Sequence, residues 1–120
     1  MAHTGSTVPV IRRAVRRVLE QSPAFKALPA DTQTSVARDT VRVTTYLAGA
    51  APPNVELPPF VAGLVHGVFN GVVDASVQQM DAYASLMNSV ARTVDTSDDS
   101  DDARRTVMRK VKRGMAARRL

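Results

Sequence analysis

Apolar residues recur every three to four positions along four stretches of this 120-residue chain, at 8–21, 30–48, 59–94 and 103–119. That spacing places them on one face of an α-helix. No stretch of useful length alternates apolar and polar residues, the pattern of a half-buried strand. The sequence therefore predicts an all-α fold, a small bundle of about four helices.

Turn-forming residues separate the helical stretches. Thr7 can cap the first helix, which would place Pro9 in its first turn. Ser22–Pro23 ends that helix and can cap a short turn. Gly49 ends the second helix, and the four prolines within 49–59 predict a stiff, extended connector.

The third stretch is the longest and predicts a central helix. No proline occurs between Pro59 and Val94, and a continuous helix over this range would be ~50 Å long at 1.5 Å per residue. Whether the helix breaks near Gly71–Asp74 stays open. We expect the other helices to pack along it.

An acidic segment divides the chain before its last helix. Four aspartates lie within 96–102, so we expect a helical bundle over 1–95, an acidic linker over 96–102 and a basic amphipathic helix over 103–120. The linker is expected to cap the last helix and screen its arginines. A calcium loop fits less well, because the central Gly and closing Glu of an EF-hand are missing.

The net charge of +5 conceals strongly polarised segments. Residues 1–28 carry +4, residues 29–95 carry −3, residues 96–103 carry −4 and residues 104–120 carry +8. Local clusters of charge, more than totals, select partners. We therefore expect the two basic ends to do the binding.

Both terminal helices combine an apolar stripe with a basic face. Such helices bind polyanions, acidic protein grooves or anionic membrane surfaces. Two of them raise the prospect of one shared basic face. The alternative is a pair of solvated helices docked by their stripes. The candidate binding residues are Arg12, Arg13, Arg16, Arg17, Arg104, Arg105, Arg109, Lys110, Lys112, Arg113, Arg118 and Arg119.

The composition limits both the core and the mode of binding. The chain has no Cys and no Trp and only five Phe and Tyr residues, so a disulfide scaffold, a thiolate metal site and a cysteine nucleophile are excluded. We expect a core of Val, Leu, Ala and Met. Because stacking aromatics are scarce, any binding of nucleic acid would be directed at phosphates and weakly sequence-specific.

A row of small residues is the most specific pattern in the chain. Gly63, Gly67 and Gly71 recur every four residues, followed by Ala75. Glycines at this spacing let another backbone approach closely, as they do in associating membrane helices. Three interpretations remain: packing within the chain, self-association in water as part of a larger particle, or membrane association.

Catalytic patterns are weak. His66 and Asp74 are two helical turns apart, too far to share one metal ion on a straight helix. No nucleophile turn or phosphate-binding loop occurs. We predict a protein that is not an enzyme and needs no cofactor or metal.

The start of the chain and the uncharged run over residues 57–73 indicate where in the cell the protein is located. Residues 1–7 are polar, predicting a frayed start, and no apolar run follows that would make a secretory signal. The arginine-rich beginning also fits a mitochondrial transit peptide. Residues 57–73 lack charge, but prolines start this run and acidic residues flank it, which disfavours a membrane span. We expect a cytoplasmic protein.

Overall fold

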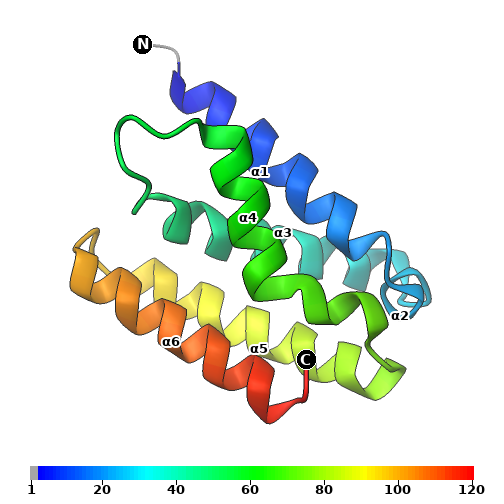
Figure 1. The fold of residues 1–120 in the computed structure, drawn as a ribbon. Helices are drawn as coiled ribbons and strands as arrows, with labels where there is room; N and C mark the ends of the chain where they lie inside the picture. The colour runs from blue at the N-terminus through cyan, green and yellow to red at the C-terminus, as the bar shows by residue number, and fades with distance from the viewer. Residues whose placement is uncertain (1–2) are drawn as a thin grey trace.

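In the computed structural model, which describes residues 3–120 and side chains from Thr7 onward, the chain folds into α-helices without any strand (Figure 1). This confirms the all-α prediction. The described residues form six α-helices and one 3₁₀ helix: α1 (His3–Leu19), α2 (Pro23–Lys26), α3 (Ala30–Ala48), α4 (Leu57–Phe69), η1 (Asn70–Asp74), α5 (Val77–Thr96) and α6 (Asp101–Ala117).

Helix α3 lies at the centre of the arrangement. It packs against α1 on one side and α5 on the other, while α4 packs chiefly on α1 (Figure 1). Helix α6 packs on α5 and also contacts α3. Val107, Val111 and Met115 of α6 are buried in the same hydrophobic cluster as the residues of the other helices, so the last helix shares the common core.

The core contains more aromatic surface than the composition predicted. Val, Leu, Ile, Met and Ala dominate it by number, yet Tyr83 and Phe69 are its largest fully buried side chains. Their rings meet edge to face, with centroids 6.2 Å apart. The Tyr83 hydroxyl lies 2.8 Å from the hydroxyl of Thr40, which itself donates to the Val36 carbonyl at 2.8 Å. The phenol is buried because its hydroxyl has this partner.

The expected long central helix is wrong as a continuous element. The chain leaves α-helical geometry after Phe69, forms η1, and passes through the extended Ala75 before α5 begins. Ser76 starts α5 with a capping box, in which its side chain accepts from the Gln79 amide and the Gln79 side chain accepts from the Ser76 amide. The break therefore falls at Gly71–Asp74, the position left open by the sequence.

Other helix boundaries lie close to those expected, with one difference at the start. Helix α1 is already formed at His3, so Pro9 sits inside the helix and Thr7 is not its cap. Proline lacks the amide that would bond the carbonyl four residues earlier, so α1 lacks one backbone hydrogen bond at Pro9. The frayed start predicted for 1–7 is thus wrong from His3 onward, and Met1 and Ala2 lie outside the described residues.

The proline-rich connector is shorter than expected. Residues 49–56 carry no helix, and α4 begins at Leu57 with Pro58 and Pro59 in its first turn. Proline is favourable there because the first amides of a helix have no partner within it. Within residues 3–120 no helix is both long enough and apolar enough to cross a membrane.

Candidate anion-binding surfaces

Helix α1 buries its apolar stripe and leaves its arginines in solvent. Ile11, Val15 and Leu19 are at most 1% exposed, whereas the four arginines on the opposite face are exposed. Arg16 lies 3.9 Å from Glu20, but both side chains are more than half exposed, so the pair contributes little. The side chains of Arg12, Arg13 and Arg17 have no hydrogen-bond or ion-pair partner among the described residues; Gln21 donates only to the Arg17 main-chain carbonyl.

A fifth arginine, from α3, joins this surface, and the sequence did not reveal it. Arg38 lies across a groove of about 340 Å³ from Arg12 and Arg16, and no described residue pairs with it. The sequence placed Arg38 in the acidic middle of the chain. In the sequence, the helical periodicity indicates only that Arg38 is exposed. It does not indicate which helix lies next to Arg38.

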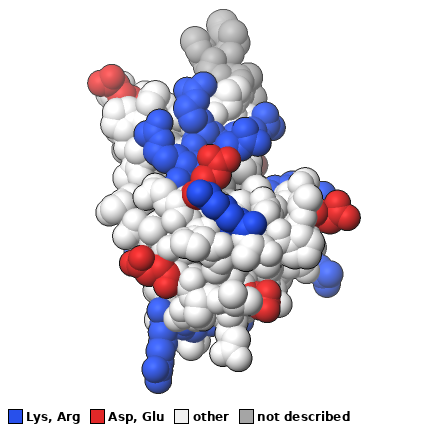
Figure 2. Space-filling view, turned by 90° about the vertical axis from the view of Figure 1, so that its right-hand side faces the viewer, with Lys and Arg blue, Asp and Glu red and all other residues white. Residues whose placement is uncertain are grey.

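Lys and Arg side chains gather on the side of the molecule where α1 ends. Figure 2 shows most of them in the upper half of this face, with carboxylates beside them. The lower half carries scattered groups of both charges. The basic side chains therefore form a local concentration of charge on this side.

Helix α6 carries a second basic surface. Its stripe of Val107, Val111 and Met115 is buried, and most of its bases are exposed. Thr106, Arg109, Lys110 and Arg113 line a shallow, open depression of about 440 Å³. The Lys110 ammonium donates to the Thr93 hydroxyl at 2.9 Å. The remaining exposed bases of this surface are Arg105, Arg109, Lys112, Arg113 and Arg119.

Two of the predicted binding arginines are bound within the chain. The Arg104 side chain is only 16% exposed; its Nε donates to the Tyr46 carbonyl at 3.0 Å, and its guanidinium lies over the Tyr46 ring, 5.2 Å from the centroid. Arg118 donates to the carbonyls of Ala82 at 3.1 Å and Gly114 at 2.9 Å. Both side chains connect elements of the fold and have few donors left for a partner.

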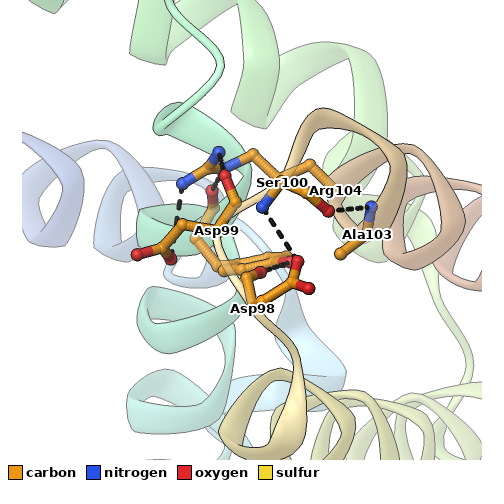
Figure 3. A network of polar contacts seen from close by, with 6 residues as sticks. Asp98, Asp99, Ser100, Ala103 and Arg104 are labelled. Atoms are coloured by element: carbon orange, nitrogen blue, oxygen red, sulfur yellow. Dashed lines mark hydrogen bonds and ion pairs between the residues drawn. The ribbon is translucent and has the colours of Figure 1, made fainter.

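The acidic segment forms a compact turn around Arg104 (Figure 3). The Ser100 hydroxyl accepts from the Ala103 amide at 3.0 Å and caps α6, while Asp99 pairs with Arg104. Hydrogen bonds from the side chain and the amide of Ser100 hold the pKa of the Asp98 carboxyl below its ordinary value. The segment thus caps α6. Its Asp99 pairs with Arg104, an arginine that connects elements of the fold.

The two basic helices do not form one continuous surface. In Figure 1, α1 runs above α3 and α4, whereas α6 lies below them against α5. The fold therefore presents two separate basic regions, one on α1 with Arg38 and the other on α6.

The small-residue row is divided between exposed and packed positions. A Cβ added at Gly63 or Gly67 would have no described atom within 4 Å, whereas one at Gly71 would collide with the main chain of Leu120. Ala75 is 9% exposed. Packing within the chain thus explains the last two positions but leaves the exposed Gly63 and Gly67 without an internal contact.

Polar side chains that hold metals do not converge. Among the described residues, no three His, Cys, Asp or Glu side chains form a group able to hold a metal ion. His66 is exposed on α4. Comparisons of the chain with models of protein families, with curated proteins and with solved structures find no match.

Proposed function

We propose that the protein is a binding module, not an enzyme, whose basic helices engage an anionic partner: a polyanion or an acidic protein surface. One observation supports this most directly. Arg12, Arg13, Arg17 and Arg38 are exposed and have no partner among the described residues. Each guanidinium offers several donors in a planar fork that suits carboxylate and phosphate groups.

The division into two basic regions affects how such a partner would bind. A long polyanion that reaches both regions gains avidity, because its second contact is intramolecular. A short anion contacts one region only. Tyr83 and Tyr46 are 9% exposed or less, so they offer no platform for stacking bases, and any contact with nucleic acid would be to phosphates.

Retention on immobilised heparin, and binding to a DNA duplex of about 20 base pairs, test this function across a salt series. We expect salt-dependent binding that weakens in an Arg13→Ala/Arg17→Ala variant. Arg92→Ala is the matched control, since Arg92 is an exposed arginine on α5, a helix that contributes no arginine to either region. Absence of salt-dependent retention on both probes would contradict the proposal.

A second function is favoured by Gly63 and Gly67. Their exposed, open positions on α4 would let a second copy bring a helix close, so we also propose self-association through this face, as in a structural or assembly protein. Light scattering at increasing concentration tests it. Gly67→Leu should remove a multimer that Ser89→Leu, on the exposed face of α5, leaves intact; a wild-type monomer at every concentration would exclude it.

A further inference from the structure

The groove between α1 and α3 combines exposed arginines with a largely apolar floor. Arg12 and Arg16 stand on the α1 wall and Arg38 on the α3 wall. Between them lie Val15, Ala37 and Val41. The depression around Arg109 and Arg113 on α6 is lined by polar and charged side chains only. A hollow between α3 and α6 does have apolar lining residues, but its arginines, Arg104 and Arg105, are paired with Asp99 and Asp102.

The groove is elongated along α1. A smaller hollow of about 150 Å³ shares Arg16, Thr34 and Ala37 with it and continues to Leu19 and Glu20. From position 12 to position 20 a helix rises about 12 Å. The accessible floor is thus about two helical turns long.

The electrostatics of the groove select an anion with an apolar side. Arg12 and Arg38 have no partner on the described chain, whereas Arg42, one turn beyond Arg38, is already paired with Asp95. The unpaired cations on opposite walls therefore attract carboxylates or phosphates. A phosphate backbone would satisfy the walls but bury nothing against the floor, whereas apolar side chains placed there gain about 25 cal/mol per Å² buried.

We propose that this groove binds an acidic amphipathic helix of a partner protein. This inference rests on the anion-binding function proposed above and names its partner. Two adjacent helices accept a third in the furrow between them, at an interaxial distance of about 8–10 Å. Arg12 and Arg16 are one turn apart, which matches carboxylates at i and i+4 on the bound helix.

A second copy of this chain does not supply such a helix. Its densest acidic segment, Asp98–Asp102, lies in the turn before α6 and in that helix's first residues. No apolar stripe accompanies these aspartates in the sequence. The bound helix therefore comes from another protein, with glutamates or aspartates flanking a row of leucine-like residues.

The probe is a labelled synthetic peptide of about 14 residues, about 21 Å long as a helix. Its leucines lie on one face, flanked by glutamates at i and i+4. A peptide of the same composition, scrambled so that no apolar face forms, is its control. By fluorescence anisotropy we expect the full-length protein to bind the amphipathic peptide about tenfold more tightly or better, because only this peptide covers the floor.

Variants then locate the site. Ala37→Glu places a carboxylate on the half-buried floor and should weaken binding by about tenfold or more, as should Arg12→Ala/Arg38→Ala. The matched control is Arg92→Ala, an exposed arginine on α5, which should change affinity by less than about twofold. Helix content by circular dichroism identifies any variant that does not fold, and Val41→Lys provides a second floor substitution.

The outcomes separate this inference from the proposed function. Equal binding of both peptides, with no effect of Ala37→Glu or Val41→Lys, overturns the groove while heparin binding sustains the broader function. A loss of peptide binding in Arg92→Ala as large as in Arg12→Ala/Arg38→Ala also overturns it. A DNA duplex that competes with the peptide and is itself lost in Ala37→Glu would place nucleic acid in the groove instead. Failure of heparin and both peptides removes the proposed function and this inference together.

Discussion

The guanidinium of Arg104 lies over the ring of Tyr46 and donates to that residue's own carbonyl oxygen, although 58 positions separate the two in the chain. Tyr46 is in the last turn of α3, where the helix dipole favours a cation, and its carbonyl also accepts from the Gly49 amide at 3.2 Å. Its hydroxyl in turn donates to the Asp98 carbonyl at 2.6 Å. The start of α6 is therefore connected to the end of α3 through Arg104 and Tyr46.

Replacing Arg104 by alanine should destabilise the fold. The substitution removes a largely buried cation–π contact and a charged hydrogen bond, together worth about 2 kcal/mol. The stability of Arg104→Lys should lie between those of the wild type and Arg104→Ala, because lysine keeps the charge but loses the planar fork. Urea unfolding measures the free energy, and Arg105→Ala is the control: Arg105 is exposed and pairs only with Asp102, so we expect a loss below about 0.5 kcal/mol. Equal losses would contradict the structural role of Arg104.

Tyr83 should make the protein sensitive to alkali. Burial raises the pKa of its phenol well above the ordinary value, so the unfolded chain ionises near pH 10 while the folded chain stays neutral. The unfolded state then binds fewer protons, and stability present below about pH 10 is lost as the pH rises further.

Tyr83→Phe tests this dependence. The variant loses one buried hydrogen bond, so we expect it to be about 1 kcal/mol less stable at neutral pH, with Thr40 still bonded to Val36. Above about pH 10 its stability should fall less steeply than that of the wild type. Parallel urea midpoints of the two proteins up to about pH 11 would show that Tyr83 does not carry the alkaline transition.

Gly63 and Gly71 should respond in opposite ways to alanine. At Gly63 the added methyl meets no described atom, so the gain in helix propensity should stabilise the protein by about 0.5–1 kcal/mol. At Gly71 the methyl collides with the main chain of Leu120, and the resulting shift should cost about 1–3 kcal/mol. Thermal or urea unfolding of the pair measures the difference. Two variants of equal stability would mean that the end of the chain does not pack on η1.

The turn before α6 should contribute an acid-sensitive part of the stability. Because the Asp98 pKa is lower in the folded state, the unfolded state takes up the proton first, and the contribution present above about pH 4 is lost as the pH falls through the folded value. Asp98→Asn should flatten this decline in urea midpoints measured between about pH 5 and pH 3. Ser100→Ala should flatten it too and also cost about 1 kcal/mol as a lost cap. An unchanged acid slope in both variants would exclude this turn as its source.

Much of the secondary structure was predictable because its causes are local. The span of α3, the Ser22 cap of α2 and the Ser100 cap of α6 all follow from side chains within one turn of the backbone they bond. The continuous central helix was wrong for the same reason. Apolar residues keep their spacing of three to four positions across Gly71–Asp74. This periodicity does not indicate that the chain turns there so that α5 packs on α3.

The candidate site was only partly predictable. That α1 and α6 bury a stripe and expose their bases follows from helical spacing. Two other features depend on which helices are neighbours. Arg104 donates to Tyr46 and is not available to a partner, and Arg38 faces Arg12 and Arg16 across a groove. No local pattern encodes those pairings.

The amino-acid order fixes where helices form and which side of each is apolar, because hydrogen bonds and caps within a helix connect residues only three or four positions apart. Assembly of the core assigns each charged or small side chain its role. It leaves the side chains of Arg12 and Arg38 without a partner among the described residues, buries most of Arg104, and opens Gly63 to solvent while closing Gly71. Those roles depend on contacts between distant segments, which burial of the shared apolar surface selects.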